Sequence, residues 1–284
     1  MSRKINSSAE AILDKEYKCL DKGFVRLVDY MGGDESIVQA ARVSYGAGTK
    51  SVNEDRGLIR YLMRHLHTTP FEMVELKFHC KLPIFVARQW IRHRTANVNE
   101  YSGRYSIMKD EFYVPSADTI HFQSQKNKQG RDETEVPAET RQQIIDELLS
   151  EQTTSYSNYE KFLELNIARE LARINLPLSL YTEWYWKIDL HNLFHFLRLR
   201  LDEHAQYEIR VYADAMAEIT KHVAPIAYEA FEDYILHSEK FSRLEMNVLK
   251  TLLKPKDYSD DELSKLGLGK READEFREKM KRLL

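Results

Sequence analysis

Hydrophobic and polar residues alternate without interruption over residues 74–82, where every even-numbered position is apolar. This period of two residues predicts a β-strand with one buried face and one polar face. Residues 24–30 and 181–188 are rich in aliphatic and aromatic side chains, and we predict a strand in each. A shorter strand is predicted over residues 111–114, and the first strand ends at Gly32 and Gly33.

Helical periodicity covers most of the remaining chain. Helices are predicted over residues 34–42 with Asp34 as the cap, around 58–63 with an end before Pro70, and over 84–92, 138–165, 169–175 and 190–234, the last broken at Pro225. Residues 123–136 are polar and are expected to form a mobile insertion. Few strands and many helices predict an α+β fold, in which a small, mostly antiparallel sheet packs with long helices.

The polarity of the chain divides it into three parts. We expect residues 1–20 to form an N-terminal arm, residues 20–238 to form the main domain, and residues 239–284 to form a charged helical extension. In the extension, Ser259 followed three residues later by Glu262 is typical of the capping box that begins a helix.

The amino-acid composition of the chain excludes several classes of protein. The chain has 10 glycines and 7 prolines among 284 residues, which fits a helix-rich fold and argues against a glycine-rich phosphate loop. A net charge of −3 gives no general attraction to nucleic acid or membranes. Cys19 and Cys80 stand too far apart for a disulfide framework or a CxxC metal site. No apolar run approaches the roughly 20 residues of a membrane span, the first residues lack a signal core, and we expect a cytoplasmic protein.

The richest candidate chemistry lies in residues 88–105, which hold four arginines, one histidine and one carboxylate. Arginine presents a fork of donors that matches phosphate oxygens. Ser102 and Gly103 can bring a hydroxyl group and open backbone N–H groups close to an anion. The alternative is a solvated basic loop. The neighbouring Trp90, Tyr101 and Tyr105 and the position after a predicted strand and helix favour a binding site.

A second polar cluster lies in residues 189–204. At 100° per residue the polar positions fall on two sides of a helix: His191, His195, Arg198 and Asp202 on one, Arg200 and His204 nearly opposite. Such a helix is expected to be enclosed, as between subunits, and its polar groups then need partners. Enclosed Arg200 requires an anion or a carbonyl group. His191 and His195 could instead bind a metal, but the HExxH glutamate is missing, and packed histidines without a metal are favoured.

Two smaller groups are less specific. Residues 65–72 end a helix with several polar side chains, and the alternative to a ligand site is a helix end capped by a threonine. Arg169 and Arg173 share one helical face, for which an exposed charged surface is the default interpretation.

Arg92-His93-Arg94, seven residues and then Ser102 match the RHR-x7-S signature of the flavin-dependent thymidylate synthases, and the resemblance extends over residues 92–106. Further segments resemble this family in order: LDKGFVRLVDYMG, AARVSYG, TPFE, PIFVARQW, ARELARINLPLSLYT and LRLDEHAQYEIR. The resemblance covers roughly residues 20–235, which makes the main domain a flavin-dependent thymidylate synthase domain. Asn97 is a departure, because the family often has serine there.

The resemblance implies the conversion of dUMP to dTMP. Methylenetetrahydrofolate would supply the carbon, and NADPH would reduce a bound FAD. The family is homotetrameric, and each site is assembled from several subunits. Arginines would bind the FAD phosphates, which agrees with the absence of a glycine-rich fingerprint.

The resemblance also implies roles for particular residues. The positions that match FAD contacts are Thr69, Arg92, His93, Arg94, Glu100, Asp189, His191 and His195, with His67 close to Thr69. The positions that match dUMP contacts are Gln89, Arg92, Glu100, Tyr101, Ser102, Gly103, Arg104, Arg173 and Arg200. Arg200 resembles the catalytic arginine that polarises the uracil ring and favours ionisation at N3. Some members carry Asn, Arg and Asn at positions 189, 191 and 195.

No protein nucleophile is expected. Uracil C5 is a poor nucleophile, and one solution is to add a cysteine thiolate at C6. Cys19 precedes the first predicted strand and Cys80 faces the apolar side of its strand, so neither lies in an electropositive pocket. Ser102 would need a base beside it. We therefore expect Ser102 to position dUMP without forming a covalent bond.

Other classes of protein remain to be weighed. A nucleic-acid-binding protein would use residues 88–105 as a basic, aromatic strip, but the net charge of −3 and the short strip argue against it. A purely structural helical scaffold is disfavoured by the polar residues expected to be enclosed. A nucleotide-binding metalloenzyme without flavin is a further alternative.

Overall fold

A computed structural model describes residues 5–43, 52–125, 130–253 and 258–283 of the chain. The chain divides into two compact units, Met1–Leu236 and His237–Leu284. Residues 44–46 of the AARVSYG segment and residues 126–129 of the polar insertion lie outside the described ranges.

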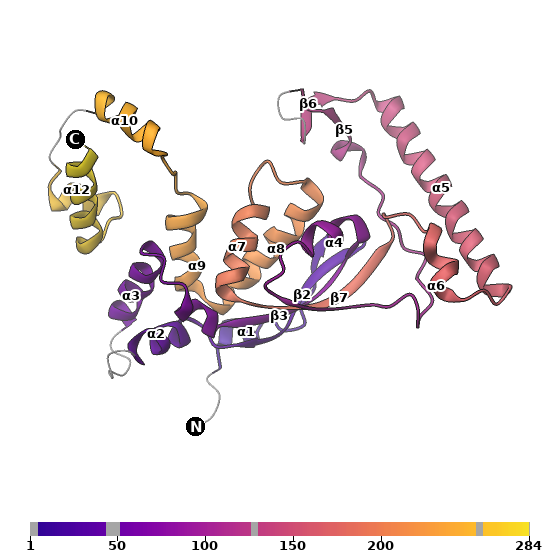
Figure 1. The fold of residues 1–284 in the computed structure, drawn as a ribbon, viewed down its shortest axis with the longest axis horizontal. Helices are drawn as coiled ribbons and strands as arrows, with labels where there is room; N and C mark the ends of the chain where they lie inside the picture. Colours follow the sequence, from indigo (N-terminus) through magenta and orange to yellow (C-terminus); the bar gives the residue numbers. More distant parts are fainter. Residues whose placement is uncertain (1–4, 44–51, 126–129, 254–257, 284) are drawn as a thin grey trace. The chain divides into compact units, whose positions relative to one another are not determined.

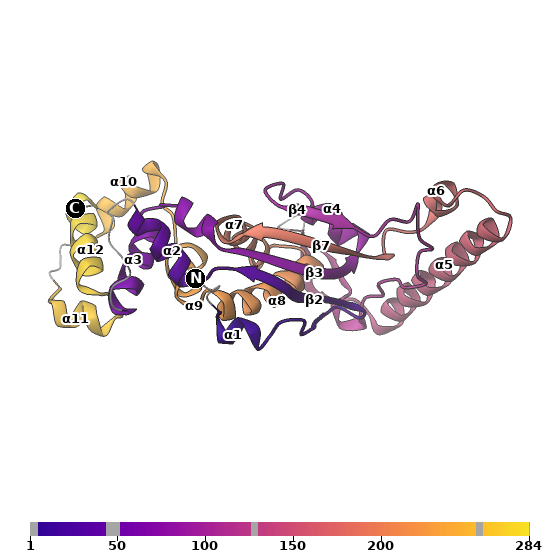
Figure 2. The same ribbon diagram turned by 90° about the horizontal axis from the view of Figure 1, so that it is seen from below.

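A five-stranded sheet forms the centre of the first unit, with the strand order β1-β2-β3-β7-β4 and antiparallel pairing throughout. The strands are β1 (Tyr17–Cys19), β2 (Gly23–Met31), β3 (Glu75–Pro83), β4 (Asn97–Glu100) and β7 (Tyr181–Asp189). The long central pair runs from Glu75 opposite Asp189 to Pro83 opposite Tyr181, and Figure 2 shows β2, β3 and β7 side by side. The predicted α+β class with a small antiparallel sheet is confirmed.

The period of two residues in β3 places its apolar side chains in the core. Leu76, Phe78, Cys80 and Leu82 are fully buried, whereas the intervening Lys77, His79 and Lys81 are only partly buried. Burial of each large apolar side chain contributes about 1.5–3 kcal/mol. This face therefore fixes β3 against the helices, and the opposite face carries the charged residues.

Helices of the first unit pack against the buried face of the sheet, as Figure 1 shows for α4, α7 and α8. The helical elements are α1 (Ser7–Glu10), α2 (Asp34–Val43), α3 (Val52–Arg64), η1 (Thr69–Met73), α4 (Ile84–Trp90), η2 (Ala117–Thr119), α5 (Ala138–Glu164), α6 (Arg169–Ala172), η3 (Arg173–Asn175), α7 (Leu190–Arg200), α8 (Tyr207–Val223), α9 (Pro225–Phe231) and the π-helical η4 (Glu232–Leu236). The segment 1–20, expected as an arm, contributes α1 and β1, and Ala9 and Cys19 are buried.

Trp90 lies at the centre of the aromatic core. Its ring stacks on Phe196 at 4.9 Å between centroids and meets Trp184 and Trp186 edge-on at 5.4 and 5.3 Å. Aromatic pairs in these geometries add stability beyond their buried area. Because Trp90 ends α4, this packing fixes the point from which residues 92–94 leave the core.

Asp34 begins α2, but its carboxylate caps another helix. Its two oxygens accept hydrogen bonds from the backbone N–H groups of Ile226 and Ala227, both at 2.9 Å, in the first turn of α9. Burial raises the pKa of Asp34 to about 6, although these two hydrogen bonds oppose the shift. The side chain thus ties α2 to α9.

Four local predictions need correction. Residues 111–114 form no strand, and only a single bridge joins Phe112 to Leu180. Residues 97–100, where no strand was predicted, form β4 because they pair with β7. The polar insertion of residues 123–136 contributes β6 (Arg131–Glu135), which pairs with β5 (His121–Gln123) at the start of the insertion.

The fourth correction concerns the helix expected over residues 190–234, which is interrupted between α7 and α8, well before Pro225. Helix α7 ends at Arg200, and Asp202 then accepts a hydrogen bond from the backbone N–H of His204 at 2.8 Å. Asp202 and His204 therefore do not continue the stripes of polar residues on α7.

The second unit consists of α10 (Arg243–Leu252), α11 (Asp260–Lys265) and α12 (Lys270–Leu283). The predicted capping box is confirmed: Ser259 and Glu262 exchange side-chain and backbone hydrogen bonds at the start of α11. Leu263 and Ala273 are its buried apolar residues. Among the described residues, no helix has both the length and the apolar character required to cross a membrane.

Candidate active site

The structure places the predicted site residues in three groups, apart from Arg92 and Arg94, which lie exposed in the segment after α4. The His93 group lies between the end of α4 and the end of α7 and contains Gln89, His93, His195 and Arg200. The Gly103 group lies along β4 and the turn after it and contains Glu100, Tyr101, Ser102, Gly103, Arg104 and Arg173. The α7 entry group contains Thr69, Asp189 and His191. Within the described chain, no hydrogen bond or ion pair joins the His93 group to the Gly103 group.

Arg200 and His93 are hydrogen-bonded partners. Nε of Arg200 donates to Nε2 of His93 at 3.1 Å, and both side chains are partly buried. The His93 ring also packs edge-on against Phe196 at 4.9 Å and lies 5.9 Å from the His195 ring. Burial, together with the charges of Arg200 and His195, lowers the pKa of His93 to about 4. His93 is therefore neutral at pH 7, with Nε2 free to accept and the proton on Nδ1.

Helix α7 sets the position of Arg200. Its residues Leu193, Phe194, Phe196 and Leu197 are buried in the core, which fixes the rotation of the helix about its axis. Arg200 is its last residue, and burial lowers the pKa of its guanidinium group. The group stays charged at neutral pH because the ordinary pKa of an arginine side chain is far above 7. In one copy of the chain α7 is not enclosed on all sides, since His195 is exposed.

Strand β4 holds the Gly103 group against β7. The backbone N–H of Tyr101 donates to the carbonyl of Glu183 at 2.8 Å. The Glu100 carboxylate accepts a hydrogen bond from the buried Thr182 hydroxyl, also at 2.8 Å. The Tyr101 hydroxyl donates to the carbonyl of Ile107 at 2.7 Å. Glu100 is thus positioned by β7 and pairs with none of the arginines in this group.

Gly103 lies directly against Arg173. A Cβ atom at position 103 would lie 2.6 Å from Sδ of Met108 and 3.0 Å from Cδ of Arg173, so both side chains would have to shift. Glycine therefore lets the Arg173 side chain lie close against the buried backbone of the turn. The structure brings together Arg173 and the RHR-x7-S segment, although about 70 residues of sequence separate them.

Ser102 and Arg104 complete this turn. The Ser102 hydroxyl accepts a hydrogen bond from the Arg104 backbone N–H at 3.3 Å. The Arg104 guanidinium pairs with the Glu170 carboxylate at 3.0 Å, and both side chains are exposed. Exposed ion pairs of this kind contribute little to the stability of the fold. Arg104 can therefore exchange Glu170 for a ligand at low cost.

The α7 entry group has mainly local contacts. Asp189 caps α7, since one oxygen accepts from the Asn192 backbone N–H at 2.9 Å and the other from the Asn192 side chain at 2.7 Å. Thr69 begins η1 and is exposed. The element η1 packs against α7 through Phe71 and Phe194, whose rings are 6.5 Å apart. The described residues contain no group of three or more potential metal ligands.

Five arginines of the predicted site and its RHR segment have no carboxylate partner within the part of the chain that the structure describes: Arg88, Arg92, Arg94, Arg173 and Arg200. Arg169, which bonds the Tyr105 carbonyl, and Arg198 on α7 have none there either. Elsewhere some arginines are closely paired, as Arg42 with Asp55 at 2.6 Å and Arg60 with Asp233 at 2.7 Å, whereas Arg210 bonds a backbone carbonyl. Guanidinium groups without a carboxylate partner are suited to bind anions, above all phosphates.

Two contacts of the site were missed from the sequence. Gln89 donates a hydrogen bond to Gln206, and Gln206 in turn donates to Glu208 at 2.8 Å. Both partners lie in the LRLDEHAQYEIR segment, which resembles the family, but no local pattern relates them to Gln89. The contact between Thr182 and Glu100 was also missed, because it depends on the pairing of β4 with β7.

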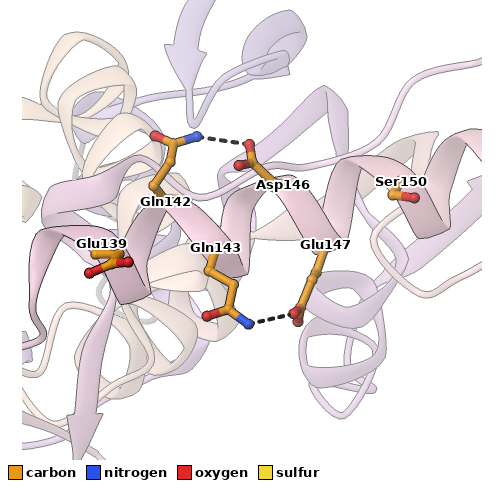
Figure 3. A pocket seen from close by; sticks show the side chains of 6 residues that line it. All are labelled: Glu139, Gln142, Gln143, Asp146, Glu147 and Ser150. Atoms are coloured by element: carbon orange, nitrogen blue, oxygen red, sulfur yellow. Dashed lines mark hydrogen bonds between the residues drawn. The ribbon is translucent and has the colours of Figure 1, made fainter.

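A shallow hollow along α5 lies apart from these groups. It is lined by one helix face: Glu139, Gln142, Gln143, Asp146, Glu147 and Ser150 (Figure 3). The side chains pair along the helix, Gln142 with Asp146 at 2.8 Å and Gln143 with Glu147 at 2.9 Å. None of the predicted site residues lines it.

Comparison with known proteins identifies the family of the chain. A family model described as "Thymidylate synthase complementing protein" matches residues 26–226. The chain is 59% identical over 263 residues to the "Flavin-dependent thymidylate synthase" of Ehrlichia ruminantium (strain Gardel), covering 93% of this chain and 87% of the relative. It is 57% identical over 270 residues to the protein of that name from Wolbachia pipientis wMel, covering 95% and 94%.

The comparison with solved structures agrees with this family. The UMP/dUMP methylase PolB from Streptomyces cacaoi, in its crystal structure bound with 5-Br UMP, is 32% identical and has a TM-score of 0.70. The match covers 78% of this chain and 99% of PolB. The chain therefore belongs to the flavin-dependent thymidylate synthase family of enzymes.

Proposed function

We propose that this enzyme catalyses the reductive methylation of dUMP to dTMP. Methylenetetrahydrofolate is the carbon donor and NADPH is the reductant, acting through bound FAD. The observation that carries the proposal is the set of five arginines without carboxylate partners around the RHR-x7-S segment. The names of the relatives and the 5-Br dUMP bound in a second PolB structure support it.

The residues present fit FAD. The unpaired guanidinium groups of Arg92 and Arg94 are donors suited to its diphosphate. In this proposal FAD is held by Thr69, Arg92, His93, Arg94, Glu100, Asp189, His191 and His195. Asp189 and Glu100 already accept hydrogen bonds from Asn192 and Thr182, so they bind through their remaining lone pairs. When bound, FAD supplies the redox chemistry that NADPH drives.

The nucleotide is bound by the Gly103 group together with residues from α4 and α7. Its contacts are Gln89, Arg92, Glu100, Tyr101, Ser102, Gly103, Arg104, Arg173 and Arg200. Arg173 suits the phosphate, since its guanidinium fork lies beside Gly103 and has no carboxylate partner among the described residues. Glycine at position 103 lets the arginine side chain approach the backbone this closely.

Arg200 is assigned to polarise the uracil ring. Its Nε donates to neutral His93, which leaves the two terminal amino groups of the fork for a ligand. A partly buried guanidinium acts on developing negative charge more strongly than an exposed one. His93 therefore orients the group, while its neutral ring adds no competing charge.

No side chain of the enzyme is assigned as a nucleophile. Cys19 and Cys80 are buried in the core, and burial raises the pKa of Cys19 to about 12 and that of Cys80 well above its ordinary value. Ser102 receives a hydrogen bond from Arg104, and among the described residues no histidine, lysine or carboxylate is bonded to its hydroxyl. A serine without a base is a weak nucleophile.

We further propose a homotetramer whose sites are shared between subunits. Exposed apolar side chains concentrate near the end of α5 and along α6 and η3: Phe162, Leu165, Ile167, Leu171, Ile174 and Leu178. Apolar patches of this kind mark protein interfaces. A cytoplasmic location, the absence of nucleic-acid and membrane partners, and the division at residues 20 and 238 stay predictions.

The direct test is a reconstituted assay. The purified protein should be yellow from bound flavin, dUMP should increase NADPH oxidation, and dTMP should form when methylenetetrahydrofolate is present. A colourless preparation that does not bind added FAD would contradict the proposal. A salt-dependent RNA gel shift by flavin-free protein would favour the nucleic-acid-binding alternative, and stoichiometric metal would favour a metalloenzyme.

A further inference from the structure

Glu208 is a buried carboxylate linked to the candidate nucleotide site. It lies in the first turn of α8, and only 3% of the residue is exposed. One oxygen accepts a hydrogen bond from the Tyr113 hydroxyl at 3.1 Å and also pairs with the Arg131 guanidinium. The other oxygen accepts from Nε2 of Gln206 at 2.8 Å. A charge buried this deeply is retained only with such partners.

Two distant segments hold the charge of Glu208. Arg131 comes from β6 in the polar insertion, and its guanidinium also lies over the Tyr207 ring, 5.4 Å from the centroid. Tyr113 is fixed through its backbone carbonyl, which accepts from the buried Gln152 side chain of α5 at 3.0 Å. Burial and the neighbouring Glu208 raise the pKa of Tyr113, so its hydroxyl stays protonated and donates.

The charge determines which way two amide groups point. A carboxylate can only accept hydrogen bonds, so Gln206 must turn its NH2 group toward Glu208. Its carbonyl oxygen then faces Gln89, which donates from Nε2. The carbonyl oxygen of Gln89 is left for another partner. The buried charge of Glu208 therefore sets the orientation of the Gln89 amide through the intervening Gln206 side chain.

We propose that Glu208 is a positioning residue for the nucleotide site, acting through Gln206 to fix the amide orientation of Gln89, with Arg131 of the insertion holding the carboxylate. The inference rests on the proposed function, because it takes Gln89 as a dUMP contact. It also gives the β5–β6 hairpin a role, since its arginine completes the network.

The test measures dUMP affinity on the full-length, FAD-loaded protein by isothermal titration calorimetry. Glu208→Gln keeps the shape but can both donate and accept, so it no longer imposes one orientation on Gln206. We expect the Kd for dUMP to rise about tenfold, or about 1.4 kcal/mol, with FAD content unchanged. Gln206→Leu removes the amide that joins Glu208 to Gln89. Because Gln206 is exposed, this variant tests the same pair of hydrogen bonds even if Glu208→Gln fails to fold.

A matched control separates positioning from stability. Asp34→Asn also neutralises a buried carboxylate, which caps α9 and has no link to Gln89. It should lower the Tm while leaving the Kd for dUMP unchanged within twofold. In a Gln89→Ala background, Glu208→Gln should weaken dUMP binding no further, because the Gln89 amide that Glu208 orients is already absent.

Three results would overturn the inference. They are a wild-type Kd in both Glu208→Gln and Gln206→Leu, an equal loss of affinity in Asp34→Asn, or a full effect of Glu208→Gln in the Gln89→Ala background. Failure of the wild-type protein to bind dUMP is a different result, and it would contradict the proposed function itself.

Discussion

His93 accepts a hydrogen bond from Arg200 as a neutral imidazole, with 3.1 Å between Nε2 of the histidine and Nε of the arginine. The end of α4 and the end of α7 meet through this pair. A protonated His93 would lose the lone pair that accepts this bond and would place a second positive charge beside Arg200. Burial of His93, whose ring packs against Phe196, and the charge of Arg200 both lower the pKa of His93 and so keep the imidazole neutral for this bond.

This relationship predicts a pH dependence of stability. Burial and the charge of Arg200 lower the pKa of His93 from 6.5 to about 4, so the unfolded chain binds a proton in this range and the folded chain does not. The stabilisation is fully present above about pH 6.5 and is lost as the pH falls toward 4. Relative to His93→Gln, the wild-type protein should lose roughly 1–2 kcal/mol of unfolding free energy between pH 7 and pH 4.5.

Urea unfolding at several pH values measures this difference. The comparison with His93→Gln is needed because Asp34 acts in the opposite direction: its pKa is raised from 3.8 to about 6, so its contribution weakens as the pH rises through that range. Asp34 is present in both proteins, so its contribution cancels in the difference between their unfolding free energies. A difference between the two proteins that stays constant with pH would refute the assigned state of His93.

Arg200→Ala should abolish nearly all dTMP formation while FAD still binds. The arginine is expected to act on the uracil ring, and the FAD contacts assigned to Arg92 and Arg94 remain. Flavin absorbance of the purified variant and product analysis by chromatography measure the two properties. Arg210→Ala is the control, because Arg210 binds only the carbonyl of Glu203 at 2.8 Å. Normal turnover in Arg200→Ala would disprove the role.

Gly103→Ala should raise the Kd for dUMP by tenfold or more. The added methyl group would lie 2.6 Å from Sδ of Met108 and 3.0 Å from Cδ of Arg173, so Met108 must move and the Arg173 side chain must shift from its place beside the turn. Gly57→Ala is the matched control within α3, since a Cβ there meets no atom within 4 Å. That change should leave dUMP binding intact and stabilise the helix by about 0.5–1 kcal/mol. Equal dUMP affinity in the two variants would exclude the proposed contact.

Ser102 should form no covalent bond with the nucleotide. Its hydroxyl accepts a hydrogen bond from Arg104 and has no base bonded to it among the described residues. Ser102→Ala should therefore keep measurable turnover, with a higher KM for dUMP. Mass spectrometry of the enzyme quenched during turnover provides the check, and a stable nucleotide adduct on Ser102 would show that the mechanism is wrong.

The assembly prediction concerns the exposed apolar side chains near α6. Ile174→Asp and Leu171→Asp introduce charges at positions that are 76% and 57% exposed in one copy of the chain. If they lie between subunits, both variants should shift the tetramer to smaller species and lose activity together. Light scattering coupled to size exclusion measures the mass. An active wild-type monomer would contradict shared sites.

Much of the architecture could be predicted from local patterns. The alternation over residues 74–82 determines which face of β3 is buried, because side chains of a strand point alternately to its two sides. Likewise, Ser259 and Glu262 specify the start of α11 within one helical turn. The RHR-x7-S segment identifies the family for a comparable reason, since its residues are close together in the sequence.

Only the tertiary structure decided how distant residues meet. Arg200 with His93, Arg173 with Gly103, and Glu208 with Gln89 through Gln206 join segments far apart in the chain. β4 forms because β7 offers it an edge, whereas residues 111–114 find only one bridge. Local periodicity depends on neighbours two to four residues away, while these contacts depend on strand register and on how helices pack, which no short segment encodes by itself.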